Sequence, residues 1–224
     1  MNPPLWKRIA SYFYTFEIEK TSSFYNSELQ VRYANGRFQL CTANAIYSYG
    51  DLYDNFSKSF ERLSLGRRHF KTVLLLGFGL GSIPFMLERK FGKKYHYTAV
   101  EIDEIVLQLA QKYVVADLNS PIDFICADAA AYVAQTERQF DLICMDVFLD
   151  DVVPSVFEQP HFLETLRQRL QPNTGLLLYN RLTTSDLDKK NTRDYYHRVF
   201  QKVFPDATYF DVDGNWMLVN KTTV

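Results

Sequence analysis

The chain has 224 residues, of which 47% are hydrophobic, and its 25 Lys and Arg residues nearly balance 26 Asp and Glu residues, for a formal net charge of -1. This apolar share is enough for a full hydrophobic core and argues against an intrinsically disordered chain. The near-zero charge argues against a general nucleic-acid binder, which needs surplus positive charge to neutralise phosphates.

The sequence favours a protein that neither crosses a membrane nor holds a metal. No apolar run reaches the roughly 20 residues that a membrane-spanning helix needs, and the N-terminus lacks the apolar core of a secretory signal. The cysteines, Cys41, Cys126 and Cys144, form no close pair, and the histidines have no metal-ligand spacing. Cys126 and Cys144 lie in strand-like runs, where we expect small buried side chains. We therefore expect a cytoplasmic protein.

The texture of the chain changes near residue 70, which predicts an N-terminal region over residues 1–68 and a second unit over 69–224. The first region is expected to contain a short helix and then β structure. Residues 28–33 and 37–41 alternate in polarity and flank Asn35-Gly36. An Asn-Gly pair predicts a hairpin here, because a type I′ turn needs positive φ at both central positions.

A helical pattern follows over residues 51–65, where we expect Asp51 to cap the helix and Gly66 to end it. The N-terminal region is also rich in aromatic residues. We expect these in a core or a subunit interface rather than on a base-stacking surface. They include Tyr12, Phe13, Tyr14 and Phe16.

Beyond residue 70, apolar runs alternate with helical patterns. The expected strands are 71–76, 95–100, 122–126, 140–145 and 176–179. The expected helices are 83–91, 104–115, 129–135, 160–170 and 187–203. Continuous apolar strands separated by helices predict an α/β fold with a mainly parallel sheet covered on both faces. The final runs, 207–212 and 216–220, predict an antiparallel hairpin at the sheet edge.

Ligands of open α/β sheets bind at the carboxyl ends of the strands, so the residues that follow each strand are candidates for a site. The first strand is followed by Gly77-Phe78-Gly79-Leu80-Gly81. Such glycines let the backbone approach a ligand and turn tightly into the next helix. The spacing differs from the G-x-G-x-x-G of dinucleotide enzymes, and a glycine turn without a ligand is the alternative.

Acids follow the next three strands. Glu101 ends the second strand and is placed to accept hydrogen bonds from ribose hydroxyls, since Asp103 already serves as the helix cap. Asp128 either accepts a hydrogen bond from an adenine amino group or caps the following helix. Asp146 ends the fourth strand, and an acid-rich stretch with Asp150 and Asp151 follows it. This stretch either suits a cationic substrate or is a solvated loop.

This pattern resembles a known family. Residues 71–180 are similar to the catalytic domain of spermidine synthases, the polyamine aminopropyltransferases, within the class I S-adenosylmethionine-dependent methyltransferase fold. The N-terminal hairpin region resembles the small β domain of that family. The matching segments are 73–81, 100–103, 127–129, 140–146, 153–163 and 170–175.

The resemblance implies a Rossmann-like fold that binds S-adenosylmethionine or decarboxylated S-adenosylmethionine as co-substrate, without a metal. The glycines would line the methionine-derived part, and the acids would hold ribose and adenine. The cofactor-binding residues implied in this way are Gly77, Phe78, Gly79, Gly81, Glu101, Ile102, Asp128 and Ala129.

The resemblance also implies a catalytic set and a substrate. Asp146 would help to deprotonate the attacking amine, because only a neutral amine can attack the carbon beside a sulfonium. Asp150 and Asp151 would bind the other charged ends of a small polyamine-like substrate, and Tyr53 would lie at the entrance. The family is commonly dimeric, so a homodimer is expected, with no nucleic-acid or membrane partner.

Two departures from the family pattern leave other functions open. Leu80 and Leu149 stand where the family carries acids. Leu80 favours a methyltransferase of a small molecule, which needs no acid at that position. The incomplete acid set also favours a third alternative, a non-catalytic nucleoside-binding or interaction module.

Overall fold

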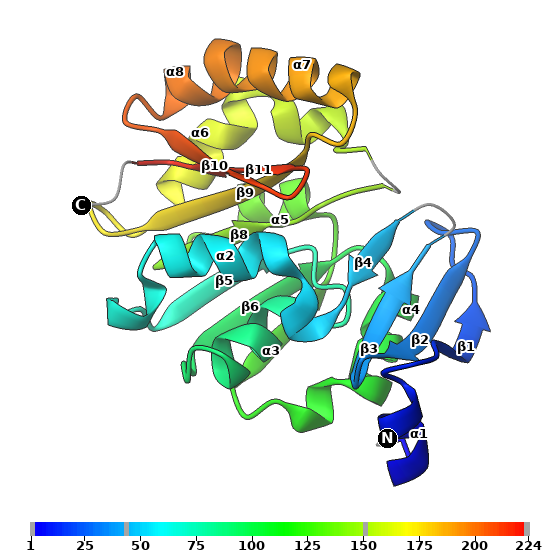
Figure 1. Cartoon of the computed structure of the whole chain (residues 1–224). Helices are drawn as coiled ribbons and strands as arrows, with labels where there is room; N and C mark the ends of the chain where they lie inside the picture. The colour runs from blue at the N-terminus through cyan, green and yellow to red at the C-terminus, as the bar shows by residue number, and fades with distance from the viewer. Residues whose placement is uncertain (1–2, 43–44, 150–151, 222–224) are drawn as a thin grey trace.

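The computed structural model describes residues 3–42, 45–149 and 152–221, which form two sheets flanked by helices (Figure 1). The larger sheet has the strand order β10-β11-β9-β8-β5-β6-β7. Neighbours from β9 through β8, β5 and β6 to β7 are parallel, and β10 and β11 add an antiparallel hairpin at one edge. The strands are β5 (Thr72–Leu76), β6 (His96–Glu101), β7 (Ile122–Cys126), β8 (Leu142–Met145), β9 (Leu176–Leu182), β10 (Thr208–Val212) and β11 (Asn215–Val219). The predicted α/β fold is confirmed.

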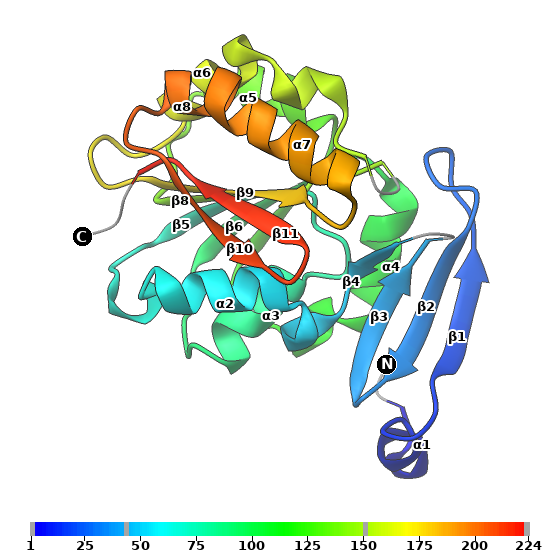
Figure 2. The same ribbon diagram turned by 45° about the horizontal axis from the view of Figure 1, so that its top comes forward.

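Helices cover both faces of this sheet (Figures 1 and 2). Alternate residues of β5 explain why: Val73 and Leu75 pack into one hydrophobic cluster, and Leu74 and Leu76 pack into another. The first cluster includes residues of α2 (Asp54–Arg62), α3 (Ser82–Arg89) and α4 (Glu104–Tyr113). The second includes residues of α5 (Ala129–Gln135), α6 (Pro160–Gln168), α7 (Asp186–Tyr195) and α8 (Gln201–Val203), with a π-helical segment, Tyr196–Phe200, between the last two.

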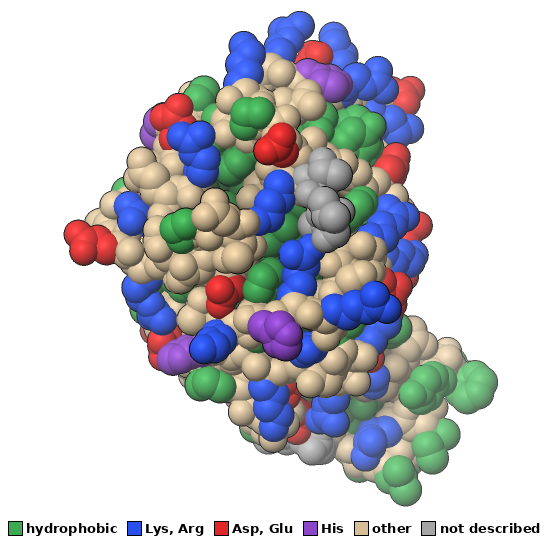
Figure 3. All heavy atoms as spheres, turned by 90° about the vertical axis from the view of Figure 1, so that its left-hand side faces the viewer, with side chains coloured by type: hydrophobic (Ala, Val, Ile, Leu, Met, Phe, Trp, Pro, Cys, Tyr) green, Lys and Arg blue, Asp and Glu red, His purple; other side chains and the backbone are tan. Residues whose placement is uncertain are grey.

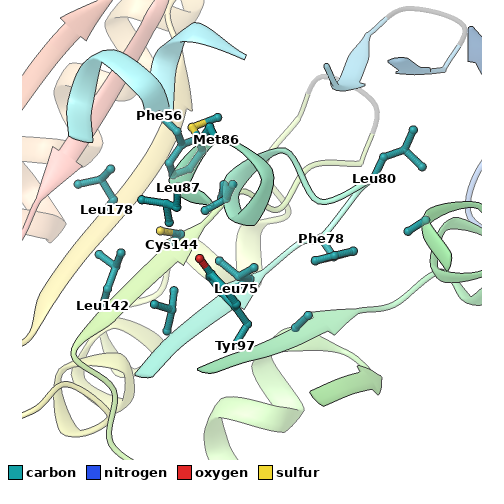
Figure 4. Packing of buried hydrophobic residues seen from close by; sticks show 14 of the residues in the cluster. Phe56, Leu75, Phe78, Leu80, Met86, Leu87, Tyr97, Leu142, Cys144 and Leu178 are labelled. Carbon is teal, nitrogen blue, oxygen red and sulfur yellow. The ribbon is translucent and has the colours of Figure 1, made fainter. Parts of the chain in front are cut away.

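The two strand cysteines have different environments. Cys144 of the central strand β8 is fully buried near Leu87, Leu142 and Leu178, as expected (Figure 4). Cys126 is exposed, so the prediction that it is buried was wrong. The reason is topological: β7 is the edge strand of the sheet, and Cys126 is its last residue.

The smaller sheet is antiparallel and stands beside the larger one (Figure 2). Asn35 and Gly36 have φ values of 51° and 72°, which confirms the predicted hairpin turn between its middle strands. The flanking strands β1 and β4 were not predicted. This part of the chain contains α1 (Leu5–Ala10), β1 (Phe16–Thr21), β2 (Leu29–Ala34), β3 (Arg37–Cys41) and β4 (Ile46–Ser48).

The predicted helix over residues 51–65 is shorter in the structure. The side chain of Asp51 binds Arg37, with 2.6 Å between Oδ1 and Nε, and Tyr53 occupies the N-cap position of α2. The helix ends at Arg62, and Ser64 takes the left-handed backbone conformation, with a φ of 49°. The capping role of Asp51 and the stop at Gly66 were therefore wrong.

The aromatic residues that follow α1 do not belong to the core. Tyr12, Phe13 and Tyr14 are 64%, 80% and 72% exposed, and Phe16 is partly buried. The lower protrusion of the face in Figure 3, where α1 lies, accordingly carries hydrophobic side chains. Among the helices of the described ranges, none has the length and apolar character needed to cross a membrane.

Candidate functional site

A cavity of about 340 Å³ lies at the carboxyl ends of β5, β6 and β8, with β4 and the β1–β2 loop on its other side. The structure brings most of the predicted site residues to its walls. Gly81 does not line the cavity, and Asp150, with its neighbour Asp151, lies outside the described residues. The predicted residues that do line it are Tyr53, Gly77, Phe78, Gly79, Glu101, Ile102, Asp128, Ala129 and Asp146.

The glycine turn after β5 lets two chain segments approach closely. Gly77 has a φ of 83°, and a Cβ atom there would lie 2.2 Å from the carbonyl oxygen of Asp146. No side chain fits this space, so glycine is required where the turn leaves the strand. Gly81 has a structural role, because a Cβ atom at this position would lie 2.8 Å from the Phe78 ring.

Glu101 points into the glycine turn. Its Oε2 accepts hydrogen bonds from the backbone N–H groups of Phe78 and Gly79 at 3.0 and 3.3 Å, and its Oε1 accepts one from Asp103 at 3.2 Å. Burial raises the pKa of Glu101 above its ordinary value, and these N–H donors oppose that rise. A carboxylate has about four acceptor positions, so room for one further donor remains.

Asp103 ties the small sheet to the large one at the mouth of the cavity. It caps α4 by accepting a 3.0 Å hydrogen bond from the N–H of Ile105, as predicted. Its other oxygen accepts hydrogen bonds from Ser23 and from Asn26, the latter at 2.8 Å. The β1–β2 loop is therefore anchored against the end of β6.

Asp128 combines the two roles that the sequence left open. Its Oδ1 caps α5 by accepting a 2.8 Å hydrogen bond from the N–H of Ala131, and its side chain also lines the cavity. Within the described part of the chain, Oδ2 has no hydrogen-bond partner. The helix cap and a ligand contact are thus compatible.

Asp146 sits between a tyrosine and an asparagine. Its Oδ1 accepts a 2.9 Å hydrogen bond from Nδ2 of Asn180 and a longer one, 3.4 Å, from the hydroxyl of Tyr53. Burial raises the pKa of Asp146 to about 6, and both hydrogen bonds act against that rise. Burial and the neighbouring carboxylate hold the pKa of Tyr53 well above its usual value, so its hydroxyl remains a donor. A carboxylate with a pKa near neutrality is suited to exchange protons.

The wall beyond Asp146 is mostly apolar. It is formed by Val147, Phe148, Leu149, Pro154, Val156, Phe157 and Leu182. Leu149 and Val152 form a short antiparallel bridge, with reciprocal hydrogen bonds of 2.9 and 3.1 Å, in the segment that follows β8.

Several residues of the cavity were missed from the sequence. Asn180 follows the expected strand 176–179, so the rule that selected Asp146 would also have selected it. Ser48 and Ser82 line the opposite wall and bond to each other at 2.6 Å between their hydroxyl oxygens. No local signal marks Ser48, because its strand, β4, has only three residues.

Comparison with known proteins agrees with this architecture. A family model described as a methyltransferase domain matches residues 73–173. A polyamine aminopropyltransferase from Vibrio vulnificus is 26% identical over 157 residues, which cover 67% of this chain and 50% of that protein. A probable polyamine aminopropyl transferase from Bifidobacterium longum is 28% identical over 115 residues, 51% of this chain and 25% of that protein. The chain thus spans half or less of the curated relatives that it matches.

Solved structures share the fold. Spermidine synthase from Thermotoga maritima superposes with a TM-score of 0.69 at 16% identity, over 91% of this chain and 72% of that chain. Human methyltransferase-like protein 13, solved in complex with SAH, gives 0.60 at 23% identity, over 75% of this chain and 82% of that chain. A spermidine synthase in complex with the transition-state analogue AdoDATO superposes with a TM-score of 0.64 at 16% identity, over 91% of this chain and 71% of that chain. The expected resemblance is confirmed: the chain is similar in sequence to polyamine aminopropyltransferases, and it shares the class I methyltransferase fold of these solved structures.

Proposed function

We propose that this protein is a transferase that binds an adenosyl sulfonium compound and moves an alkyl group from its sulfur to an amine. One observation carries the proposal: Asp146, a carboxylate with a pKa of about 6, shares a single cavity with Glu101 and the glycine turn. The nucleoside and the proton acceptor would therefore lie side by side. Relatives that are named aminopropyltransferases, and structural neighbours solved with SAH and AdoDATO, support the same reading.

The residues present fit an adenosyl group. The free acceptor position of Glu101 suits one ribose hydroxyl, and a second hydroxyl would displace the longest bond, from the N–H of Gly79. Oδ2 of Asp128 is available for an adenine amino group, and Ala129 and Ile102 supply apolar contacts beside it. No group of three or more potential metal ligands occurs among the residues that the structure describes.

The chemistry at Asp146 follows from charge. An amine is protonated in water, and its lone pair becomes a nucleophile only after the proton leaves. Asp146 takes that proton, the nitrogen–carbon bond forms, the carbon–sulfur bond breaks, and the sulfur keeps the bonding electrons as a neutral thioether. The hydroxyl of Tyr53 and the amide of Asn180 hold the carboxylate in place.

Two transferred groups are candidates, each with its own support. The named relatives favour an aminopropyl group from decarboxylated S-adenosylmethionine, with a polyamine as acceptor. The buried Leu80 favours a methyl group from S-adenosylmethionine: its side chain is 2% exposed, belongs to the core and lies outside the cavity walls (Figure 4). Leu80 therefore offers no charge to the amino end of an aminopropyl donor.

Calorimetric titration with S-adenosylmethionine, its decarboxylated form and methylthioadenosine tests the proposal, followed by mass spectrometry of amine products. Binding of the decarboxylated form alone supports aminopropyl transfer, and binding of the parent compound supports methyl transfer. If none of the three nucleosides binds, the proposal fails and a non-catalytic module remains.

We further propose that the protein is a cytoplasmic homodimer without a nucleic-acid or membrane partner. Each chain would consist of an N-terminal region, residues 1–68, and a second domain, residues 69–224. The exposed side chains of Tyr12, Phe13 and Tyr14 support a subunit interface at this surface, because exposed apolar patches are typical of protein–protein contact sites. Light scattering of the full chain tests the assembly, and a monomer at micromolar concentration would contradict it.

A further inference from the structure

We infer that the acceptor nitrogen keeps one N–H group throughout the transfer, so that this site alkylates primary and secondary amines and does not make quaternary ammonium ions. The inference rests on the proposed alkyl transfer at Asp146 and names the degree of substitution of its acceptor. It concerns the reacting nitrogen alone and applies equally to a monoamine and a polyamine. The amide oxygen of Asn180 is the group that would hold the retained N–H.

Asn180 lies beside Asp146 because of the strand register. Met145 of β8 pairs with Tyr179 of β9. The residues that follow them, Asp146 and Asn180, are therefore neighbours where β8 ends. Asn180 also pairs with Met217 of β11, which holds its backbone from the other side, and its side chain is 1% exposed and lines the cavity. Strand pairing and burial thus keep the amide next to the carboxylate.

The hydrogen bond between these two side chains decides which atom of the amide remains for a ligand. Oδ1 of Asp146 accepts from Nδ2 of Asn180 at 2.9 Å, and an ionised carboxylate has no donor, so the amide oxygen cannot take this place. Within the described ranges, Oδ1 of Asn180 is buried without a hydrogen-bond partner, and Oδ2 of Asp146 accepts no hydrogen bond. Two acceptor atoms on adjacent side chains therefore remain for a substrate.

A secondary ammonium ion has two N–H groups, one for each acceptor. One proton passes to Asp146, and the lone pair that it leaves on nitrogen attacks the carbon beside sulfur. The nitrogen–carbon bond forms, the carbon–sulfur bond breaks, and sulfur keeps the bonding electrons. The second N–H stays on nitrogen and donates to Oδ1 of Asn180. Nitrogen becomes positive again as its new bond forms, so this hydrogen bond strengthens towards the transition state and favours the step.

A tertiary ammonium ion lacks the second N–H group. Its single N–H proton is the one that Asp146 removes, so Oδ1 of Asn180 would remain unpaired beside an alkyl group. A buried acceptor without a donor costs free energy. Primary and secondary amines avoid this cost, which therefore first arises at the transfer that would make a quaternary ammonium ion.

The test uses two amine series in which methyl groups are added to nitrogen one at a time. Butylamine is compared with its N-methyl and N,N-dimethyl forms, and 1,4-diaminobutane with the forms that carry one or two methyl groups on each nitrogen. Each amine is titrated calorimetrically at pH 7.5 into the full chain saturated with methylthioadenosine. In each series that binds, the first methylation should change Kd by less than about threefold, and the second should raise Kd about tenfold or more.

Two variants separate the hydrogen bond from crowding. Asn180→Leu removes the acceptor, so the second methylation should then change Kd by less than about threefold. Asn191→Leu, at an exposed position of α7 outside this cavity, is the matched control and should keep the loss seen in the unmodified chain. Each comparison is made within one protein, so a general loss of affinity in a variant does not affect it.

Mass spectrometry of products formed with S-adenosylmethionine and with its decarboxylated form completes the test. Secondary and tertiary amines are the expected products. A quaternary ammonium product, or equal Kd values for secondary and tertiary amines, overturns the inference and leaves the transferase intact. A loss on the second methylation that persists in Asn180→Leu assigns the effect to crowding and also overturns the inference. If methylthioadenosine binds but no amine of either series does, both the inference and amine transfer fail.

Discussion

Replacing Asp146 by Asn should stabilise the fold at alkaline pH while removing turnover. This carboxylate is partly buried in the wall of the cavity, and burial raises its pKa from an ordinary value of 3.8 to about 6. A site that keeps such a group serves chemistry rather than stability. The amide has nearly the same shape, and its oxygen can still accept the hydrogen bond from Asn180.

The size of the effect follows from proton linkage. The folded protein binds the proton of Asp146 more tightly than the unfolded chain does, so stability from this group is complete below pH 4 and is lost as the pH rises through about 6. The difference between 3.8 and about 6 corresponds to about 3 kcal/mol, at 1.36 kcal/mol for each tenfold change in acidity. Asp146→Asn does not lose this unfolding free energy, because an amide does not ionise as the pH rises.

Urea unfolding, followed by tryptophan fluorescence at pH 4.5 and pH 8, measures the effect. At pH 8 the unfolding free energy of the variant should exceed that of the unmodified protein by up to about 3 kcal/mol. This difference in unfolding free energy should be smaller at pH 4.5. Glu137→Gln, at an exposed position, is the control and should change the unfolding free energy by less than about 0.5 kcal/mol at both pH values. A gap of equal size at both pH values, or a less stable variant at pH 8, would refute the reasoning.

Three other changes test the site. The acidic limb of the pH profile of kcat/KM should fall near pH 6, and Asn180→Leu should move it to higher pH, because the Asn180 amide lowers the pKa of Asp146; an unmoved limb would contradict this. Glu101→Gln should weaken nucleoside binding in calorimetry by about 1–3 kcal/mol, the scale of a charge-assisted hydrogen bond, and unchanged affinity would exclude the ribose role. Gly77→Ala should lower the unfolding free energy by about 3 kcal/mol or more, since its Cβ would meet backbone at 2.2 Å. Gly92→Ala has a similar φ in open space and should cost only about 1 kcal/mol; equal losses would argue against the close approach.

Local sequence determined the hairpins and the alternation of strands and helices. Asn35-Gly36 and Asp213-Gly214 adopt positive φ, as their residue types favour, and both join antiparallel strands. The range 122–126 was predicted to the residue, because its run is bounded by turn residues. These features depend on neighbours in the chain, so a single sequence carries them.

The sequence also predicted that the glycine turn, Glu101 and Asp146 meet at the carboxyl edge of the large sheet, because parallel strands all end on the same side of a sheet. Tertiary structure alone decided the rest. The hydrogen bond between Tyr53 and Asp146 joins residues 93 positions apart, and Asp51 forms an ion pair with Arg37 of β3 instead of capping a helix. Cys126 is exposed because β7 lies at the sheet edge. Such facts depend on which strands become neighbours, and strand order is set by packing of the whole chain rather than by any local pattern.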